Sequence, residues 1–317
     1  MRQIPLTLVI AALTALAITW PAAPVPVLAA SDNTSLSGDA LGKNGVPAFG
    51  HIIVVVLENK EFGRIVGSES APYLNQLAAE YGLATRFYGV SHPSLPNYLA
   101  MIGGDTFGVR DDCLGCFQAA PNLVDQLEAK GITWKGYFES MPRPCFVGDS
   151  RDGLYAQKHN PFIYFDDVRN DPARCARIVP LDQLSADLAT GDLPSLIWIG
   201  PNLRSSTHDG TIAEGDRWLA NHLPPLLQSP AFEQDGLLLV TYDEGDSDAA
   251  CCGARQGGGR IVTVVASPLA KPAYTSATPF NHYSLLRTIE DAWGLDHLGH
   301  AADPAISNFA EFFASSD

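Results

Sequence analysis

The stretch His51–Leu57 (HIIVVVL) constrains the fold of this chain more than any other feature. After its first histidine it is a continuous run of β-branched and aliphatic residues, without the polar alternation of a strand that has one face in water. A strand that is apolar on both faces belongs in the interior of a parallel sheet covered by helices. The run therefore predicts a buried central strand in an α/β protein.

Strand-like apolar runs alternate with helical periodicity along most of the remaining sequence. Further strands are predicted at 84–90, 132–139, 195–200, 236–242 and 260–267, and helices at 71–82, 121–131, 180–191, 214–228 and 283–294. Pro224 and Pro225 predict a kink in the helix that contains them. The alternation predicts a single domain with a mainly parallel central sheet flanked by helices.

The N-terminal segment has the pattern of a secretory signal peptide over residues 1–30. Arg2 supplies a positive start, an apolar run follows, and small residues near Ala29 and Ala30 offer a cleavage site. An uncleaved membrane anchor is the alternative. Residues 31–47 are polar and rich in Gly and Ser, which predicts a flexible lead-in. The folded domain is expected at 48–317, in a secreted or cell-envelope protein.

The balance of charge excludes one class of partner. The formal net charge is −15 at pH 7, and the lysines and arginines are few and unclustered, which argues against nucleic-acid binding. No apolar run after the signal segment is long enough for stable membrane insertion. An acidic protein can still bind a phosphorylated substrate where a cation or a basic side chain lies in the site.

Six cysteines in an exported chain predict disulfides. Cys113 and Cys116 form a CxxC motif, but no second CxxC accompanies it to complete a zinc site. We expect Cys145 to pair with Cys175, because both flank one long loop region. The sequence leaves the remaining pairings open.

Polar residues of catalytic type follow five of the predicted strands. In an open parallel sheet, ligands bind outside the carboxyl ends of the strands, so these side chains are expected at one edge. In chain order they are Glu58 and Asn59, then Ser94, then Lys158 and His159, then Asn202, His208 and Asp209, and finally Asp243 and Glu244. This convergence predicts one active site formed by residues from several strand ends.

The residue types at this edge indicate the chemistry. The oxygen ligands Glu58, Asn59, Asp243 and Glu244 suit a hard cation such as Ca²⁺, Mg²⁺ or Mn²⁺. Solvated loop acids are the alternative, which the apolar strand before Asp243 disfavours. The side chains of Lys158, His159 and His208 are donors suited to phosphate oxygens.

Ser94 lies in the segment Gly89–Gly104 (GVSHPSLPNYLAMIGG). We expect it to be the N-cap of a short helix, where free backbone N–H groups would lower the cost of an alkoxide. The flanking residues lack the glycines of the G-x-S-x-G elbow, so an acyl-transfer triad is disfavoured. His92 is too close in sequence to be an assured base, and His282 is expected to be a cap or a supporting residue.

Several motifs resemble the phosphoesterase family of bacterial phospholipases C and acid phosphatases. The motifs are VVVLENKEFGRIVGS, HPSLPNYLAMIGG, ESMPRPC, KHNPFIYF, PNLRSSTHDGTIAEGDRWL, VTYDEG and HYSLLRTIEDAWGL, in order between about Phe49 and Asp296. The resemblance implies an alkaline-phosphatase-like fold and phosphorylation of Ser94. It also implies that His159 and His208 bind phosphate or protonate the leaving group. Two features depart from the family: Lys158 replaces a frequent second histidine, and LRSST precedes His208.

The resemblance implies that Glu58, Asn59, Asp243 and Glu244 hold a divalent metal ion together with the Ser94 oxygen. Lys158, Asn202 and Asp209 are then expected to contact the substrate.

The preferred hypothesis is an exported acid phosphatase that hydrolyses phosphate monoesters through a phosphoserine intermediate. A phospholipase C-type phosphodiesterase acting on phospholipid headgroups is the alternative, although the chain is short for a lipase of this family. A non-catalytic cation-binding protein is the third hypothesis, and it would need neither Ser94 nor His159. The expected partner is a phosphorylated small molecule or a phospholipid.

Overall fold

The computed structural model describes residues 42–254 and 257–313. The predicted signal peptide (1–30) and most of the predicted lead-in lie outside the described residues. The strands are β1 Ile52–Leu57, β2 Gly82–Tyr88, β3 Trp134–Phe138, β4 Ile178–Pro180, β5 Leu196–Gly200, β6 Leu237–Tyr242, β7 Arg260–Ala266, β8 Tyr274–Ser276 and β9 Phe280–Asn281.

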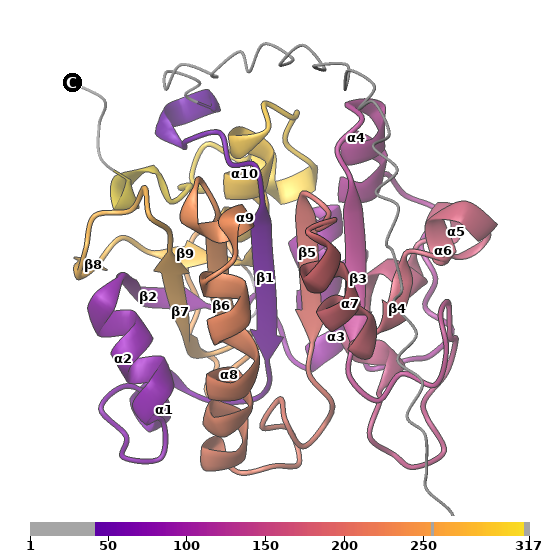
Figure 1. The fold of residues 1–317 in the computed structure, drawn as a ribbon, viewed down its shortest axis with the longest axis horizontal. Coiled ribbons are helices and arrows are strands. Elements are labelled where there is room, and N and C mark those ends of the chain that lie inside the picture. The colour runs from indigo at the N-terminus through magenta and orange to yellow at the C-terminus, as the bar shows by residue number, and fades with distance from the viewer. Residues whose placement is uncertain (1–41, 255–256, 314–317) are drawn as a thin grey trace, which may run out of the picture. The chain divides into compact units, whose positions relative to one another are not determined.

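One nine-stranded mixed sheet forms the centre of the domain. Its strand order is β4-β3-β5-β1-β6-β7-β2-β8, with β9 also paired to β2. Only β7 runs antiparallel to its neighbours, so the other strands share one direction. The carboxyl ends of β1, β3, β5 and β6 therefore meet at the lower edge of the sheet in Figure 1.

The six residues of β1 are all buried, as the apolar run predicts. Parallel neighbours β5 and β6 pair with it on either side, so β1 lies in the interior of the sheet. A strand with no polar face is stable only where both faces are covered. The central strand and the mainly parallel α/β fold are thus confirmed.

Helices cover both faces of the sheet. In Figure 1, α2, α7 and α8 lie in front of it, and α3 and α10 lie behind it. The helices are α1 Phe62–Ile65, α2 Pro72–Glu80, α3 Ser94–Gly103, α4 Leu123–Ala129, α5 Asp166–Arg169, α6 Pro172–Cys175, α7 Asp182–Thr190, α8 Ile212–Leu227, α9 Pro230–Glu233 and α10 His282–Ala292. Short 3₁₀ segments are η1 Lys43–Gly45, η2 Gln157–His159, η3 Pro161–Tyr164, η4 Gly299–Ala302 and η5 Ala310–Phe312.

Some element boundaries differ from the sequence predictions. The strand expected at 84–90 begins at Gly82 and pairs with the reversed strand β7, and helix α8 continues through Pro224 and Pro225 to Leu227. Each proline lacks the N–H that would bond to the carbonyl four residues earlier, but both lie near the end of the helix, so only a short part of the helix follows them. The short strands β4, β8 and β9 carry too few residues for a periodic signal.

The end of the predicted lead-in is held against helix α10. The side chain of Lys43 donates to the carbonyl of Leu295, Asn44 donates to the carboxylate of Asp291, and Val46 is fully buried. These contacts fix residues 43–46, in a region that the polar composition predicts to be flexible. Local composition does not reveal a tertiary partner that lies about 250 residues away in the sequence.

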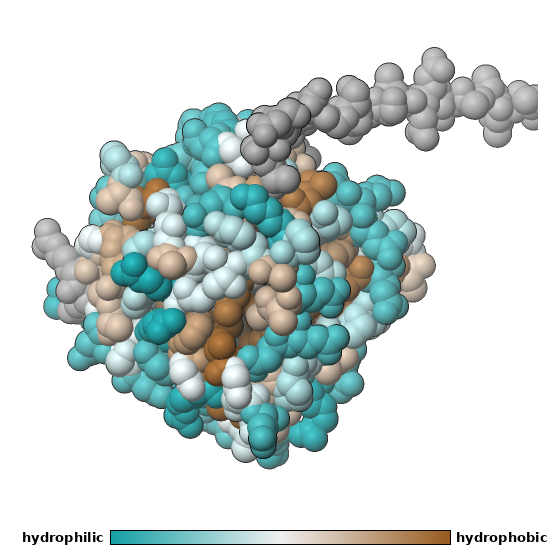
Figure 2. All heavy atoms as spheres, turned by 90° about the vertical axis from the view of Figure 1, so that its left-hand side faces the viewer, coloured by the Kyte–Doolittle hydropathy of each residue, from teal (hydrophilic) through white to brown (hydrophobic). Residues whose placement is uncertain are grey.

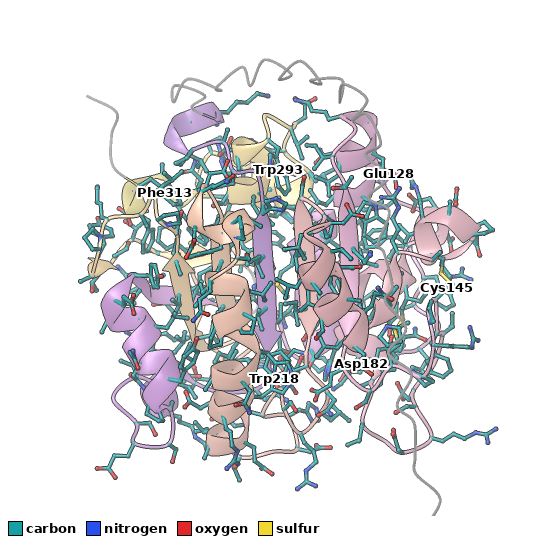
Figure 3. The ribbon with its side chains drawn as sticks, viewed as in Figure 1. Glu128, Cys145, Asp182, Trp218, Trp293 and Phe313 are labelled. Carbon is teal, nitrogen blue, oxygen red and sulfur yellow. A yellow bond between two sulfur atoms is a disulfide. The ribbon has the colours of Figure 1, made fainter. Side chains whose placement is uncertain are left out.

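The expected disulfide between Cys145 and Cys175 is present, and it joins the long loop after β3 to helix α6 (Figure 3). The other two disulfides connect Cys113 to Cys116 and Cys251 to Cys252. A disulfide between Cys113 and Cys116 rules out a thiolate metal site at the CxxC motif. All six cysteines are therefore oxidised, as expected in an exported protein.

The sheet edge formed by the short strand β8 is on the side of the molecule shown in Figure 2. Hydrophilic residues dominate this surface and surround the smaller hydrophobic areas. A short edge strand within a hydrophilic surface presents few unpaired backbone groups to other chains.

We predict that Glu290 makes the stability of the fold dependent on pH. This glutamate of α10 is fully buried, and burial, with a further contribution from the neighbouring Asp291, raises its pKa to about 8 from an ordinary 4.5. Between these two values the folded chain keeps a proton that the unfolded chain releases. The contribution of Glu290 to the free energy of unfolding therefore falls as pH rises, by at most about 1.4 kcal/mol per pH unit.

Urea unfolding of the wild type and of Glu290→Gln between pH 5 and pH 8 tests this. The amide cannot ionise, so the free energy of unfolding of the variant, measured relative to that of the wild type, should increase as pH rises. A difference in stability that stays constant across this range would contradict the prediction.

Candidate active site

Two buried carboxyl groups meet at the carboxyl ends of the adjacent parallel strands β1 and β6. Leu57 pairs with Tyr242 in the sheet, so the next residues, Glu58 and Asp243, lie side by side. Both side chains are fully buried. Asp243 Oδ1 accepts hydrogen bonds from the backbone N–H of Asn59, at 3.0 Å, and from its own neighbour in the chain, Glu244, at 2.7 Å. Asn59 has a positive φ of 57°, which asparagine tolerates better than most residues.

The environment of these carboxyl groups disfavours their charged forms. Burial raises the pKa of Glu58 to about 7. Burial, together with the neighbouring Glu58, raises the pKa of Asp243 well above its usual range. Like charges this close in the interior are stable only with a compensating cation or a shared proton.

Ser94 is the first residue of α3, and its hydroxyl donates to Glu58 Oε2 at 3.2 Å. The sequence-based assignment of Ser94 as the N-cap is wrong, because Pro93 occupies that position and no side chain of the N-cap residue bonds to the helix. Asp112, from a separate loop, instead accepts the backbone N–H of Leu95 at 3.0 Å. The hydroxyl is therefore free to turn toward Glu58 rather than toward the backbone.

Asn97 fixes the loop that leads into α3. Its side-chain carbonyl accepts from the backbone N–H groups of Val90 and Ser91, and its amide donates to the carbonyls of Ser91 and Pro93. Asn97 is completely buried, so these bonds have no water to replace them. The position of Ser94 thus depends on a side chain one helical turn further along.

Cationic and imidazole side chains surround the same carboxylate. His159 Nε2 lies 3.1 Å from Glu58 Oε2, but the two groups are not aligned for a hydrogen bond. Lys158 Nζ donates to Asp112 Oδ2 at 2.7 Å and lies 3.2 Å from His208 Nε2. Nitrogen or oxygen atoms of Glu58, His159 and His208 all lie within 4.8 Å of one another. The structure therefore brings these predicted residues together from β1, η2 and the loop after β5.

Glu244 is paired with the histidine that sequence reasoning set aside. His92 Nδ1 lies 2.6 Å from Glu244 Oε2, and its Nε2 lies 3.0 Å from the carbonyl oxygen of Ser247. The hydrogen bond to Glu244 raises the pKa of His92 to about 9, while burial raises the pKa of Glu244 to about 7. His92 is therefore a charged partner that holds Glu244 in place.

Two of the predicted substrate-binding residues lie further from the centre. Asp209 is exposed, and its Oδ1 lies 2.7 Å from His208 Nδ1. This contact orients the His208 ring. Asn202 donates to the hydroxyl of Ser140 and accepts from two backbone N–H groups of its own turn. Its side chain is thus used to shape the loop after β5, and its contact with substrate stays a prediction.

Sequence reasoning missed several residues that touch the site. Tyr98 donates its hydroxyl to Glu58 Oε1, Asp112 holds Lys158, and Lys60 donates to the carbonyl of Thr207 at 2.7 Å. The buried His282 contacts the backbone oxygen of Asp243, a supporting role of the kind expected for it. The spacing of four residues between Ser94 and Tyr98 was the available signal, because it places both side chains on one face of a helix.

The residues present fit a divalent cation. Two buried atoms, Asp243 Oδ2 and His159 Nε2, have no hydrogen-bond partner among the residues that the structure describes. Burial lowers the pKa of His159 to about 4, so its imidazole is neutral and can act as a ligand. Buried carboxylate oxygens beside a neutral imidazole form a suitable ligand set for a metal ion.

A cavity of about 400 Å³ lies elsewhere, between the loops that flank α3 and the start of α10. Its lining includes Val90, Arg110, Tyr283 and His300, but none of the residues around Glu58. The cluster at the sheet edge is assigned as the candidate site because of its chemistry and not because of its volume.

We predict that Asn97→Ala lowers the free energy of unfolding by about 2–4 kcal/mol, because it leaves several buried backbone groups without a partner. Urea unfolding followed by tryptophan fluorescence measures the loss. Ser91→Ala is the control from the same loop, since the Ser91 hydroxyl bonds only to the adjacent carbonyl of His92. Equal losses in the two variants would show that Asn97 does not anchor the loop.

Proteins of similar sequence include phosphatases and a phospholipase C. A phosphatidylinositol-3-phosphatase from Mycobacterium tuberculosis is 34% identical over 294 residues, covering 90% of this chain and 92% of that protein. A phosphate-repressible acid phosphatase from Penicillium chrysogenum is 34% identical over 80% of this chain. A non-hemolytic phospholipase C from Burkholderia pseudomallei is more distant, at 26% identity over 52% of this chain.

The lengths of these relatives differ from that of this chain. The chain spans 61% of the Penicillium protein and 31% of the Burkholderia phospholipase. Among solved structures, a protein in the alkaline phosphatase superfamily from Vibrio parahaemolyticus matches with a TM-score of 0.56 at 13% identity, covering 83% of this chain and 72% of that one. At this identity the match shows the fold alone, and it confirms the predicted alkaline-phosphatase-like architecture.

The family is shown by the sequence itself. Residues 68–296 match the Phosphoesterase family, a range that contains Ser94, His159, His208, Asp243 and Glu244. This membership and the relatives named above support a phosphoric ester hydrolase. The chain belongs to the phosphoesterase family.

Proposed function

We propose that this protein is an exported, metal-assisted acid phosphatase that hydrolyses phosphate monoesters through a phosphoserine at Ser94. The observation that carries the proposal is the buried Ser94 hydroxyl, hydrogen-bonded to Glu58 Oε2 at 3.2 Å. A buried serine that donates to a carboxylate, in a cluster that also contains Lys158 and two histidines, has the surroundings of a nucleophile, and a structural serine would need none of them.

In the first step the Ser94 oxygen attacks phosphorus in line with the leaving alcohol. The Oγ–P bond forms as the bond from phosphorus to the leaving oxygen breaks. Glu58 Oε2 is the adjacent acceptor for the hydroxyl proton. The position of Ser94 at the start of α3 adds the positive end of the helix dipole, which favours the developing negative charge.

His208 is assigned as the general acid. Its Nδ1 is paired with Asp209, and its Nε2 accepts from the Lys158 ammonium, so Nε2 carries the proton for the reaction only when Lys158 turns to the phosphate oxygens. Protonated His208 gives its proton to the leaving oxygen. His159 is less suited to this role, because burial lowers its pKa to about 4 and keeps it neutral.

In the second step His208 takes a proton from the attacking water, whose oxygen bonds to phosphorus as the Oγ–P bond breaks. Glu58 then returns its proton to Ser94 Oγ, which restores the starting state.

Lys158 is assigned to the phosphate oxygens. It replaces the second histidine that relatives often carry, and its ion pair with Asp112 holds the ammonium group beside His208. A fixed positive charge offsets the charge on the transferring phosphoryl group. The departure from the family pattern thus keeps a cation in the site.

A divalent ion would be held by Glu58, Asp243 and His159, with Asn59 and Glu244 as the further predicted ligands. When bound, it supplies positive charge that favours the ionised Ser94 oxygen and polarises the phosphate. Ca²⁺, Mg²⁺ and Mn²⁺ are the candidates, since most of the proposed ligands are carboxylate oxygens.

The relatives favour a monoesterase over a diesterase. Proteins named as phosphatases match most of this chain at 34% identity, whereas the phospholipase C match is weaker and covers about half of it. Phosphodiester hydrolysis of a phospholipid headgroup remains the alternative function, and the Mycobacterium relative supports a lipid among the possible phosphate esters. A non-catalytic cation-binding protein is disfavoured, because it would not require a buried serine beside Glu58.

The proposed export rests on two features. The N-terminal pattern is that of a signal peptide, and all six cysteines form disulfides. Within the residues that the structure describes, none of the helices combines the length and the apolar character required to span a bilayer.

We predict that Ser94→Ala lowers the turnover of an aryl phosphate by at least about 10³-fold, because the covalent route is lost. Initial rates on an aryl phosphate and on phosphatidylcholine should be measured for both proteins, with circular dichroism to confirm folding. Wild-type preference for the aryl phosphate supports a monoesterase. A folded Ser94→Ala variant with full activity would show that the serine is not the nucleophile.

We predict that a chelator abolishes activity and that one of Ca²⁺, Mg²⁺ or Mn²⁺ restores it, because Glu58 and Asp243 need a compensating cation to be ionised together. The assay is hydrolysis of an aryl phosphate after treatment with EDTA and removal of the chelator. Asp243→Asn should need a higher concentration of the restoring ion. Full activity of the chelated, metal-free protein would contradict the prediction.

A further inference from the structure

Tyr98 is a buried tyrosine of α3 that contacts two site residues at once. Its hydroxyl donates to Glu58 Oε1, and its ring stacks on the imidazole of His159 with ring centroids 5.5 Å apart and planes 22° apart. Only 1% of Tyr98 is exposed. A tyrosine whose sole role was to fill the core would need a partner for its hydroxyl, but it would not need the central carboxylate of the site.

The two oxygens of Glu58 have different neighbours. Oε1 receives the Tyr98 hydroxyl, whereas Oε2 accepts from Ser94 Oγ and lies 3.1 Å from His159 Nε2. The terminal torsion of a glutamate side chain is broad, so packing alone does not fix the rotation of its carboxylate. A hydrogen bond to one oxygen determines where the other oxygen points.

The ring of Tyr98 restricts His159 in a similar way. The imidazole is buried, and its Nε2 has no aligned hydrogen-bond partner among the described residues. The near-parallel stacking on Tyr98 limits the tilt of the ring, and therefore the direction of that nitrogen. Helix α3 presents Ser94 and Tyr98 four residues apart on one face, so one rigid element places both the nucleophile and its support.

We propose that Tyr98 is a positioning residue of this site. Its hydroxyl sets the rotation of the Glu58 carboxylate and its ring sets the orientation of His159, so that Glu58 Oε2 and His159 Nε2 face Ser94 and the cation position. This inference rests on the proposed function. Groups that orient metal ligands affect cation affinity and turnover although they touch neither the ion nor the substrate.

The substitution Tyr98→Phe isolates the role of the hydroxyl, because it keeps the aromatic ring and the packing. Tyr155→Phe is the matched control, since Tyr155 is also buried and its hydroxyl oxygen accepts a hydrogen bond from Asn160, away from Glu58. Each variant removes one buried tyrosine hydroxyl and leaves one polar partner unsatisfied. A purely structural role predicts similar effects for both.

The experiment measures three quantities on the full folded protein. The thermal unfolding midpoint of the metal-free protein reports stability. Calorimetric titration with Ca²⁺, Mg²⁺ and Mn²⁺ separately reports cation affinity, and kcat and KM on an aryl phosphate report function. We expect Tyr98→Phe to weaken cation binding and to lower kcat by about 10–100-fold each, with Tyr155→Phe within about two-fold of the wild type in both. Tyr98→Phe and Tyr155→Phe should lower the thermal unfolding midpoint of the metal-free protein by similar amounts.

A further variant, Tyr98→Leu, tests the ring. It should bind the cation more weakly than Tyr98→Phe, because His159 loses its stacking partner as well. Unchanged cation affinity and kcat in Tyr98→Phe, with an active wild type, would overturn this inference alone. A wild-type protein that neither binds any of the three cations nor hydrolyses the aryl phosphate would overturn the proposed function and this inference with it.

Discussion

The close placement of two buried carboxyl groups, Glu58 and Asp243, is the constraint on which the rest of the site depends. They follow β1 and β6, the two strands whose apolar character forces them into the middle of the sheet. Acids at that depth carry strongly raised pKa values unless a cation or hydrogen-bond donors compensate them. The surrounding residues supply the donors, and Asp243 Oδ2, which has no hydrogen-bond partner in the described part of the chain, marks where a cation would complete the compensation.

The groups that approach these acids are themselves rigidly held. Asn97 fixes the loop before α3, and Asp112 caps the helix while pairing with Lys158. His92, which lies in the loop before α3, holds Glu244 in place. The site residues lie at the ends of strands and helices and are held by buried hydrogen bonds, so the site keeps its geometry. Phosphoryl transfer requires such fixed positioning of the reacting groups.

Much of this was predictable from the sequence, for identifiable reasons. Strand direction in β-α alternation is fixed by the crossover connections, so residues after β1, β3, β5 and β6 had to share one edge. The pairing of Cys145 with Cys175 followed from the long loop between them. Strand β7 runs in the opposite direction, and sequence could not show this, because a buried strand has the same apolar pattern in either direction.

Other features depended on contacts that no local pattern encodes. Pro93 occupies the N-cap position, and Asp112, from a loop beyond the end of α3, accepts a backbone N–H of the first turn of that helix. The sequence assigned no role to Tyr98, and it placed His92 too close to Ser94 to be an assured base. Tyr98 is hydrogen-bonded to Glu58, which follows β1, and His92 is paired with Glu244, in the loop after β6.

The sequence by itself determined where the longer strands and helices form, which residues follow the central strands, and which family the chain resembles, because apolar periodicity and motif spacing are local properties. The tertiary structure alone decided which atoms of those residues meet. Glu58 has one oxygen for Tyr98 and the other for Ser94. Asp243 has one oxygen that accepts hydrogen bonds and one without a partner in residues 42–254 and 257–313. Such choices depend on the order and register of strands that are far apart in the chain, and these are settled only when the whole sheet is packed.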